Sequence, residues 1–349
     1  MIDTLAIVGA TGAVGRIILE QLIQREFPAR RIKLLASARS AGRQMEVAGR
    51  SFAVEELTPE SFADVTVAIG STPDEVAAEF VPWAVERGTV VVDESAFFRM
   101  HPDVPLVIPE VNPQAIGRHR GIIASPNCST TQMVMVMKPL HDAARVTRVI
   151  VSTYQAVSGA GLAATTELRN ATAAWLAGEV EPRQVFPHPI AANLIPQIGS
   201  PRPGGSTSEE LKMVLETRKM LEDESIAISA TCVRVPVANG HSESILIETE
   251  RKVSADEARR LLVGMPGVVV VDDLAAKRYP TPRECSGRDE VFVGRIREDD
   301  SCPNGIALWC VSDNVRKGAA TNAVQIAERL AADPRLLAGQ GRAGAAGQG

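Results

Sequence analysis

Cys128 lies in the segment Ser125-Pro-Asn-Cys-Ser-Thr130, directly before the apolar run Met133-Val-Met-Val-Met137. This order places a thiol where a loop leads into the first turn of a buried helix. The free N–H groups and the positive dipole end of a helix N-terminus favour the thiolate, which is the nucleophilic form of cysteine. Cys128 is therefore the candidate nucleophile, and its neighbours Asn127 and Ser129 are able to hold an oxyanion or a substrate group.

The remaining cysteines offer no competing pattern. The five cysteines stand at positions 128, 232, 285, 302 and 310, without a Cys-x-x-Cys pair, so neither a disulfide framework nor a zinc site is indicated. Cys232 and Cys310 fall in strand-like segments and are expected to pack in the core. An inert buried thiol is also the alternative for Cys128, but its polar neighbours favour catalysis.

A glycine-rich segment, Gly9-Ala-Thr-Gly12-Ala-Val-Gly15, follows an apolar strand at residues 5–8. It precedes a helix whose apolar residues recur at helical spacing. In this context glycines allow backbone amides to approach a pyrophosphate at the helix N-terminus. Strand, loop and helix together favour dinucleotide binding over a plain tight turn.

The end of the second strand indicates which dinucleotide binds. NAD sites usually have Asp or Glu there to hold the ribose 2′-hydroxyl, but this strand, at residues 32–36, is followed by Ser-Ala-Arg39-Ser40. An arginine beside hydroxyl groups suits a 2′-phosphate, so the sequence favours NADP with Arg39 and Ser40 as contacts. The alternative is a solvated basic turn without a ligand.

His241 follows Asn239-Gly240, a dipeptide typical of two-residue hairpin turns, between two apolar segments. Such a hairpin pairs Ala238 with His241, and period-two alternation then places Arg234 and His241 on one face. The sequence thus predicts a guanidinium and an imidazole side by side. The alternative is a half-exposed histidine at a hairpin tip.

A further candidate pair lies at the start of a helix. Thr207-Ser-Glu-Glu210 forms a capping box, which gives Glu210 a structural role in the first turn. Glu209 has no such role, and with Lys212 it presents a carboxylate and an ammonium suited to a zwitterionic, anionic substrate. Because Lys212, Glu216 and Lys219 repeat at helical spacing, a salt-bridged solvent face is an equal alternative.

Arg99 follows the segment Asp93-Glu-Ser-Ala-Phe-Phe98, just past a strand end. A doubly wound sheet opens its ligand crevice at such ends, so a phosphate contact is one interpretation. A surface arginine without a ligand is the other.

The length of 349 residues, with 45% hydrophobic and 23% charged residues, favours two domains. Strands near residues 65–69 and 90–92 alternate with a helical stretch at residues 74–86. This alternation predicts an α/β fold with an N-terminal Rossmann-type, doubly wound parallel sheet.

Beyond residue 127 the strands become longer and the helices fewer, which predicts a second α+β catalytic and dimerisation domain on a mostly antiparallel sheet. A strand at residues 306–311 and a helix at residues 317–330 follow, and the helix is expected to pack back on the first domain. The Gly/Ala-rich end is expected to be disordered. The predicted parts are residues 1–127 plus about 314–335, residues 128–313, and the tail 336–349.

The composition excludes several classes of partner. A net charge of −5 without a long basic run argues against nucleic acid, although local arginines remain able to bind small anions. The N-terminus runs directly into a strand without a signal-peptide pattern, and no apolar stretch approaches the ~18 residues needed to span a bilayer. A soluble, cytoplasmic protein is expected, and the cysteine usage fits a reducing compartment.

Five segments together resemble the aspartate-semialdehyde dehydrogenase family, over residues 1 to about 330 and most specifically around His241. The resemblance implies NADPH-dependent reductive dephosphorylation of β-aspartyl phosphate to aspartate semialdehyde through a cysteine acyl-thioester. It implies a place in the route to lysine, threonine, methionine and diaminopimelate, and a homodimer or homotetramer. The segments are Gly9-Ala-Thr-Gly-Ala-Val-Gly15, Ser125-Pro-Asn-Cys-Ser-Thr130, Thr153-Tyr-Gln-Ala-Val-Ser-Gly-Ala-Gly161, Arg234-Val-Pro-Val-Ala-Asn-Gly-His-Ser-Glu243 and Asp313-Asn-Val-Arg-Lys-Gly-Ala-Ala320.

The same resemblance implies a role for each site residue. Cys128 would be the nucleophile and His241 the acid/base, while Gln155 would orient the substrate. Arg234 would bind the substrate α-carboxylate and Glu209 its α-amino group. The residues that would hold phosphate are Arg99, Asn127 and Lys212. The residues that would contact NADP are Gly9, Thr11, Gly12, Ala13, Val14, Gly15, Arg39, Ser40, Ser71, Thr72, Ser158, Gly159 and Asn314.

The chain departs from the family pattern in two places. Where the family usually has Asp-Asn-Ser-Ser-Ala-Phe-Arg, this chain has Asp93-Glu-Ser-Ala-Phe-Phe-Arg99, and a Ser-x-Gly-Gly segment appears as Ser71-Thr-Pro-Asp74. The first departure puts an extra carboxylate, Glu94, near an expected phosphate site. The affinity for phosphate, or its pH dependence, is therefore expected to differ from the family norm.

Two other interpretations fit the same segments. One is a reductase of a related acyl donor, such as N-acetyl-γ-glutamyl phosphate or malonyl-CoA. The other is a non-catalytic NADP-binding paralogue, which would be expected to lack the nucleophile or the base, whereas this chain retains both Cys128 and His241.

Overall fold

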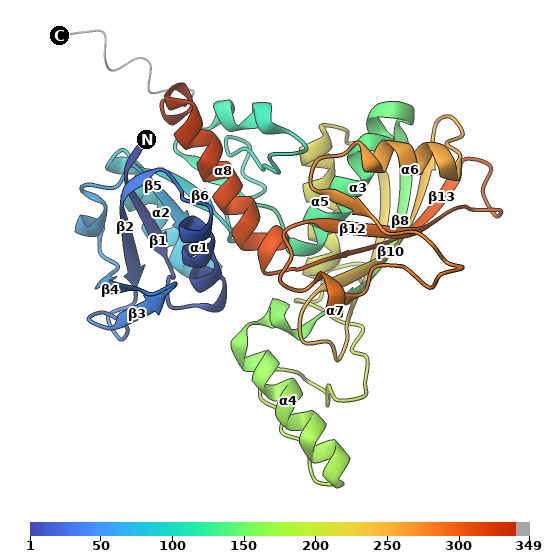
Figure 1. The fold of residues 1–349 in the computed structure, drawn as a ribbon, viewed down its shortest axis with the longest axis horizontal. Coiled ribbons are helices and arrows are strands. Elements are labelled where there is room, and N and C mark those ends of the chain that lie inside the picture. The colour runs from blue at the N-terminus through green and yellow to red at the C-terminus, as the bar shows by residue number, and fades with distance from the viewer. Residues whose placement is uncertain (340–349) are drawn as a thin grey trace. The chain divides into compact units, whose positions relative to one another are not determined.

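The computed structural model describes residues 1–339, and its ribbon is drawn in Figure 1. Internal contacts divide the chain into two compact units. The first unit comprises residues 1–127 together with the segment that begins at Ala319, and the second comprises Cys128–Gly318. No helix within residues 1–339 combines the length and apolar character needed to cross a bilayer.

The first unit is built on a seven-stranded sheet with the order β3-β4-β2-β1-β5-β6-β7. All neighbouring strands run parallel except β3 and β4, which form an antiparallel pair at one edge. The predicted doubly wound parallel sheet is confirmed, and the antiparallel edge is an addition to it. The strands are β1 (Ile2–Val8), β2 (Ala29–Ala36), β3 (Gln44–Val47), β4 (Arg50–Glu56), β5 (Val67–Gly70), β6 (Val90–Asp93) and β7 (Ile122–Ala124).

Helices cover both faces of this sheet because successive strand residues point to opposite sides. Ile7 packs with α1 (Ala13–Gln24) and α8 (Thr321–Ala332), whereas Val8 packs with α2 (Asp74–Glu86). The C-terminal helix therefore returns to the first unit. It begins four residues later than the predicted residue 317, because Arg316–Ala320 forms a π-helical turn.

The predicted tail at residues 336–349 begins too early. Pro334–Leu337 forms a 3-10 turn, and Leu336 and Leu337 pack against the core of the first unit. The carbonyl oxygen of Leu336 also lies 2.6 Å from His119 Nε2. The remainder of the predicted tail, residues 340–349, lies outside the described residues.

The second unit contains a six-stranded sheet with the order β11-β12-β13-β10-β8-β9. Its three inner pairings, β12 with β13, β13 with β10 and β10 with β8, are antiparallel, and the two outer pairings are parallel. The prediction of a mostly antiparallel sheet is confirmed. The strands are β8 (Val146–Gln155), β9 (Ala227–Arg234), β10 (His241–Thr249), β11 (Val268–Val270), β12 (Val291–Glu298) and β13 (Gly305–Ser312).

The predicted hairpin between β9 and β10 is wrong. These strands are not neighbours, because β8 lies between them. The linking segment crosses the end of β8, where Val235 N donates to Gln155 O and Val157 N donates to Val237 O. Gly240 does adopt the left-handed conformation, with φ of +90°, so the turn signal identified a turn but not the partner of the strand that follows.

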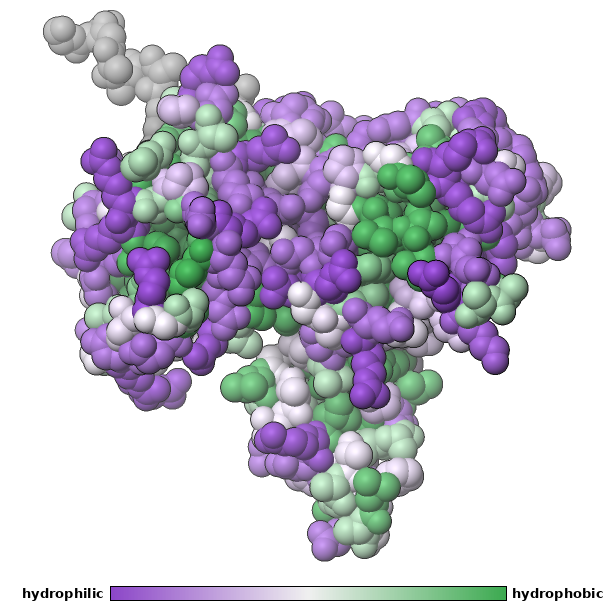
Figure 2. All heavy atoms as spheres, viewed as in Figure 1, coloured by the Kyte–Doolittle hydropathy of each residue, from purple (hydrophilic) through white to green (hydrophobic). Residues whose placement is uncertain are grey.

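Helices α3 (Cys128–Ala144), α5 (Ser208–Leu221) and α6 (Ala255–Val263) pack on this sheet. Strand β8 alternates accordingly, since Val149 and Val151 are buried while Ile150 and Tyr154 remain 37% exposed on the other face. The short α7 (Pro282–Cys285) lies in a loop, and α4 (Leu162–Ala177) projects from the sheet region (Figure 1). Figure 2 shows hydrophobic side chains on the outer surface of α4.

Candidate active site

Cys128 is the first residue of α3 and is partly exposed. The predicted position of the thiol at the start of a buried helix is confirmed, because residues 129–137 are all buried. Gly318 packs directly against this residue: a Cβ at position 318 would lie 2.8 Å from Cys128 Cβ. The backbone at Gly318 therefore fixes where the thiol stands.

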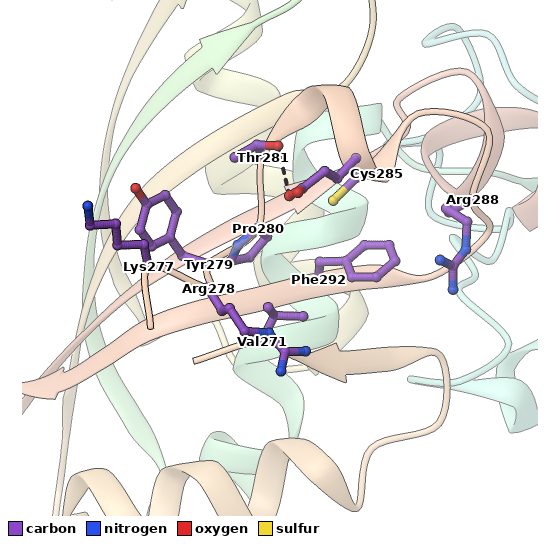
Figure 3. A pocket seen from close by; sticks show the side chains of 10 residues that line it. Val271, Lys277, Arg278, Tyr279, Pro280, Thr281, Cys285, Arg288 and Phe292 are labelled. Atoms are coloured by element: carbon purple, nitrogen blue, oxygen red, sulfur yellow. Dashed lines mark hydrogen bonds between the residues drawn. The ribbon is translucent and has the colours of Figure 1, made fainter. Parts of the chain in front are cut away.

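Three other thiols are unsuited to nucleophilic chemistry. Cys232 and Cys310 are fully buried, as predicted, and burial raises the pKa of both. Cys285 lines a pocket of about 530 Å³ whose rim carries Lys277, Arg278 and Arg288 (Figure 3). It is itself 1% exposed, and burial raises its pKa to about 12. This pocket contains none of the residues predicted to act in catalysis.

Arg234, at the end of β9, is 6% exposed and its guanidinium donates from Nη1 to Ala156 O at 2.6 Å. Burial lowers its pKa, and electrostatic interactions with Cys128, Glu209 and Cys232 act in the opposite direction. The cation therefore lies within electrostatic range of the candidate nucleophile. A buried arginine with donors still available is suited to bind a carboxylate.

His241 begins β10 and is fully buried, so the alternative of a half-exposed histidine is wrong. Arg234 pairs with Gln155 and Ser242 pairs with Tyr154, so Arg234, Gln155 and His241 follow one another across three neighbouring strands. The predicted proximity of Arg234 and His241 therefore holds, although β8 mediates it.

The imidazole of His241 has a defined tautomer. The backbone amide of Ala156 donates to Nδ1 at 3.0 Å, so the ring proton of the neutral imidazole lies on Nε2. Burial lowers the pKa of His241 well below its usual value, and the nearby Arg234 cation lowers it further. Gly159 keeps space beside both groups, since a Cβ there would lie 3.0 Å from Arg234 Nη1 and 3.1 Å from His241 Nε2.

Glu209 joins this group from α5. It is 6% exposed, and its carboxylate accepts from Gln155 Nε2 at 3.1 Å and lies 3.4 Å from Lys212 Nζ. Glu216, one of the residues of the proposed solvent face, is also buried, which contradicts that alternative. The predicted capping box is present, with Glu210 accepting from Thr207 N at 2.8 Å.

A second group of polar side chains lies at the loop that leads into β10. The Ser158 hydroxyl lies 3.0 Å from Asn239 Oδ1 and 3.0 Å from Asn314 Oδ1. Asn314 Oδ1 also accepts from Gly240 N at 3.0 Å, directly before His241. The predicted cofactor residues Ser158, Gly159 and Asn314 thus lie together at the loop that leads into β10.

The glycine loop of the first unit has the shape that a dinucleotide requires. Gly9 has φ of +83°, and a Cβ there would overlap the carbonyl oxygen of Ser71. A Cβ at Gly15 would overlap the carbonyl oxygen of Gly9, so the helix approaches the loop closely only because residue 15 is glycine. The loop residues Thr11, Gly12 and Ala13 are exposed and Val14 is partly exposed, leaving this end of α1 accessible to a pyrophosphate. The residues present therefore fit a dinucleotide.

Ser71 and Thr72 follow β5 and border this loop, since Thr72 Cγ2 lies 3.1 Å from the position of a Cβ at Gly9. The second strand ends at Ala36, without a carboxylate, and leads into a turn in which Ser40 is buried and Arg39 is exposed. Arg39 is thus accessible to a 2′-phosphate.

Arg99 is 8% exposed, so the alternative of a surface arginine is wrong. Its Nε donates to Ser125 O at 2.9 Å and its Nη2 to Glu94 O at 2.6 Å, which fixes the guanidinium at the ends of β6 and β7. Asn127 is also buried and directly precedes Cys128 in the chain. Arg99 and Asn127 belong to the first unit and Lys212 to the second.

Two contributors to these sites were missed from the sequence. Gly318 has no local signal, because its role comes from contact with a residue 190 positions away. The second is a set of buried polar atoms without a hydrogen-bond partner, Thr72 Oγ1, Asp93 Oδ1 and Glu94 Oε1, at the ends of β5 and β6. Of these three residues, Thr72 is expected from the family resemblance as a cofactor contact and Glu94 stands out as a departure from the family pattern, so Asp93 alone carries no signal in the sequence.

The Gly318→Ala variant is expected to lower activity. The added methyl group must displace Cys128, and a shift of about 1 Å at a reacting atom costs roughly 10²-fold in rate. Steady-state kinetics measures this effect. The matched control is Gly264→Ala, where a Cβ meets only contacts of 3.5 Å or more, and equal losses in both variants would contradict the packing role of Gly318.

His241 is expected to remain neutral from pH 6 to pH 8, with its proton on Nε2, because burial and Arg234 both disfavour the imidazolium. Long-range ¹⁵N–¹H NMR on protein with labelled histidines distinguishes the two tautomers and the charged form. The exposed His188 serves as an internal reference, and loss of one signal in His241→Asn assigns the resonance. A titration of His241 centred near pH 6.5 would contradict the buried environment.

The chain matches two family models that together cover most of its length. They are described as semialdehyde dehydrogenase, NAD binding domain, over residues 4–119, and semialdehyde dehydrogenase, dimerisation domain, over residues 137–317. Both are consistent with the two units of the structure.

Individual proteins show the same similarity. The aspartate-semialdehyde dehydrogenase of Aquifex aeolicus is 51% identical over 93% of this chain and 97% of that protein. A crystal structure of aspartate semialdehyde dehydrogenase II from Vibrio cholerae, complexed with ASA, has a TM-score of 0.92 at 45% identity and covers 95% of this chain and 99% of that chain. The enzyme from Candida albicans, solved with NADP, has a TM-score of 0.76 at 27% identity, with coverage of 96% and 100%.

The nucleotide-binding loop, the thiol at a helix N-terminus and these similarities agree on one assignment. The chain is an oxidoreductase that belongs to the aspartate-semialdehyde dehydrogenase family.

Proposed function

We propose that the protein reduces L-aspartyl 4-phosphate to L-aspartate 4-semialdehyde with NADPH and releases phosphate, in the route to lysine, threonine, methionine and diaminopimelate. The observation that carries this proposal is the position of Cys128 at the start of α3, within electrostatic range of the buried Arg234. His241, Gln155 and Glu209 belong to the same unit; Gln155 Nε2 donates to Glu209 Oε1 and lies 3.5 Å from His241 Nε2.

The buried groups complement an amino acid substrate. Arg234 provides a guanidinium for the α-carboxylate, and Glu209, oriented by Gln155, provides a carboxylate for the α-ammonium group. A zwitterion bound between these opposite charges would have its side-chain acyl group free to react with a nucleophile of the site. Cys128, at the start of α3 and within electrostatic range of Arg234, is the proposed nucleophile.

The proposed chemistry has two stages. The Cys128 thiolate attacks the acyl carbon of the substrate, a C–S bond forms, and the C–O bond to phosphate breaks. When bound, NADPH supplies a hydride. Reduction of the thioester at its acyl carbon would leave a tetrahedral oxyanion attached to Cys128 Sγ, which would expel the thiolate and give the aldehyde. The thiolate is thus regenerated, and the proton consumed overall is carried by the released phosphate.

His241 is proposed to act at the substrate oxygen. Because its Nδ1 accepts from Ala156 N, the side of the ring that remains for a ligand is Nε2–H, a hydrogen-bond donor. A neutral imidazole can stabilise an oxyanion by donating in this way without being protonated itself. In the proposed acid/base role, His241 would therefore act as a hydrogen-bond donor to the substrate oxygen.

The phosphate group is proposed to bind Arg99, Asn127 and Lys212. Arg99 is buried and held by two backbone carbonyls, which leaves a fixed cation at the carboxyl edge of the first sheet. Lys212 is partly exposed and close to Glu209, so its ammonium is accessible to a ligand. The related reduction of malonyl-CoA releases CoA rather than phosphate, so it would not require a phosphate site next to the acyl carbon.

NADP is proposed as the cofactor. The glycine loop and the first turn of α1 would receive the pyrophosphate, and Arg39 with Ser40 the 2′-phosphate. Ser71 and Thr72 border the same loop. The absence of a carboxylate after β2 and the accessible Arg39 support NADP over NAD.

A homodimer or homotetramer is proposed, in a reducing, cytoplasmic compartment. Helix α4 exposes Leu162, Trp175 and Leu176 by 71%, 52% and 74%, and the outer face of β8 exposes Ile150 and Tyr154. Apolar groups of this size on a surface are typical of an interface between copies. Light scattering of the purified protein tests the assembly.

The decisive experiment is phosphate-dependent reduction of NADP with aspartate semialdehyde, compared with N-acetylglutamate semialdehyde. Malonyl-CoA is tested in the reverse direction, and NAD replaces NADP in a parallel series. Turnover with aspartate semialdehyde and NADP is expected. Turnover only with another donor would assign the protein to the corresponding reductase, and none with any donor would favour a non-catalytic paralogue.

A further inference from the structure

Glu94 lies in a row of strand-end residues that also contains the glycine loop. Val8 of β1 pairs with Gly70 of β5, and Gly70 pairs with Asp93 of β6. The next residues, Gly9, Ser71 and Glu94, therefore lie side by side along the carboxyl edge of three neighbouring strands. Strands are spaced by ~4.8 Å, so Glu94 stands about 10 Å from Gly9.

The row continues through side chains. Glu94 N donates to Gly70 O at 2.9 Å, which holds its backbone at the sheet edge. Its carboxyl group forms a hydrogen bond with the side chain of Ser71, whose carbonyl oxygen in turn abuts Gly9. The carboxyl group is thus held beside Ser71, next to the glycine loop.

This carboxyl group is incompletely satisfied within the protein. Glu94 Oε1 is shielded from solvent and has no hydrogen-bond partner. The same is true of Asp93 Oδ1 and Thr72 Oγ1, at the ends of the same strands. Buried polar atoms in native proteins are nearly always hydrogen-bonded, so a group of unsatisfied atoms at one sheet edge indicates a ligand that completes them. The ligand expected at this edge of a doubly wound sheet is the dinucleotide.

The surrounding charges oppose an anionic Glu94. Asp93 lies beside it, Asp74 accepts from Ala96 N at 2.8 Å close to the same strand end, and Arg99 is the one cation that acts on Glu94 among the described residues. Burial raises the pKa of Glu94 to about 7, with Asp93 adding to the shift and Ser71 and Arg99 opposing it. A bound pyrophosphate would add further negative charge at a distance of about 10 Å, roughly one Debye length at 0.1 M salt.

We propose that Glu94 binds the dinucleotide as a neutral carboxylic acid, so that the protein takes up a proton at this residue when NADP binds. This inference rests on the proposed function of the glycine loop. Protonation of Glu94 is expected to raise the affinity for NADP. It removes the repulsion between the carboxylate and the phosphates of the ligand, and it provides an O–H donor for an acceptor atom of the ligand. Affinity for NADP is therefore highest when Glu94 is already protonated, and it falls as the pH rises above 7.

Isothermal titration calorimetry with NADP tests the proposal directly. Titrations at pH 7.5 in buffers of different ionisation enthalpy give the number of protons taken up on binding. Uptake by the wild type is expected to exceed that of Glu94→Gln by roughly half a proton. From pH 6 to pH 8.5 the affinity of the wild type is expected to fall roughly tenfold relative to that of Glu94→Gln, whose amide permanently mimics the neutral acid.

Two controls isolate the effect. Glu79→Gln removes the same charge from an exposed position on α2 and should behave as the wild type does. The 2′-phosphate of NADP itself titrates near pH 6, roughly as other phosphomonoesters do, and this contribution cancels in the difference between wild type and variant. Repeating the titration with NAD removes it altogether.

The outcomes are distinguishable. Equal proton uptake in wild type and Glu94→Gln, with NADP bound by both, would overturn this inference and leave the proposed function intact. Absence of NADP binding at every pH would instead contradict the proposed function. If Glu94→Gln does not fold, infrared difference spectra of the wild type at pH 8 decide the question: the proposal requires a protonated carboxyl band on NADP binding, and its absence overturns it.

Discussion

Replacing Cys128 with serine is expected to lower turnover by roughly 10³-fold or more while NADP binding is unchanged. A serine hydroxyl is far less ionised than a thiol at neutral pH, and loss of a covalent nucleophile typically removes most of the catalysed rate. Cys128 is not among the residues expected to contact the cofactor, and the glycine loop lies in the other unit of the chain, so the affinity for NADP should not depend on this side chain. Steady-state kinetics and calorimetric titration with NADP measure the two effects separately.

The matched control for this variant is Cys302→Ser, because Cys302 is also a partly exposed free thiol but lies in a turn after β12. Its activity should equal that of the wild type. Alkylation by iodoacetamide should inactivate the wild type by modifying Cys128 first, because it combines exposure with a helix N-terminus. Wild-type turnover in Cys128→Ser would exclude the acyl-thioester.

Replacing Arg234 with leucine is expected to raise the KM for aspartate semialdehyde roughly 10²-fold. Removing one member of a buried, hydrogen-bonded charge pair typically costs about 2–5 kcal/mol of binding. The affinity for NADP and the melting temperature should change much less, and these are measured in the same preparation. The variant also removes the hydrogen bond to Ala156 O, so thermal unfolding must accompany the kinetics.

Arg234→Lys separates charge from geometry. Lysine keeps the positive charge but cannot present two parallel donors to a carboxylate, so an intermediate KM is expected. A KM equal to that of the wild type in Arg234→Leu would remove this residue from the substrate site. An equal loss of stability and of substrate affinity in both variants would assign it a structural role instead.

The sequence predicted most of the elements because their signals are local. The glycine loop, the helix at Asp74–Glu86 and the start of α3 depend on periodicity and on residues at the element ends, and each is present. The predicted hairpin failed because Asn239-Gly240 specifies a turn, whereas the neighbour of β10 is decided by contacts with β8 and β13. Pairing in a sheet depends on distant segments that a local pattern does not contain.

The candidate site likewise contains features with a local sequence signal and features that depend on distant contacts. Cys128 and the Glu209–Lys212 pair could be selected by residue type and helix position, but the choice between a catalytic pair and a solvent face required burial. The tautomer of His241 depends on Ala156 N, and the location of Cys128 depends on Gly318, both distant in sequence. Contacts of this kind follow from tertiary packing, so residue type and spacing could not predict them.

The return of α8 to the first sheet has a consequence for biosynthesis. Ile326, Ala327 and Leu330 complete the hydrophobic core that Ile7 and Ile18 begin, yet the ribosome delivers them only after the whole of Cys128–Gly318 has been made. The second unit is continuous and can condense as soon as it emerges, whereas the nucleotide-binding unit waits with one face of its sheet covered by α1 but not yet by α8. Its nascent form is therefore the stage at which chaperones have an apolar surface to protect.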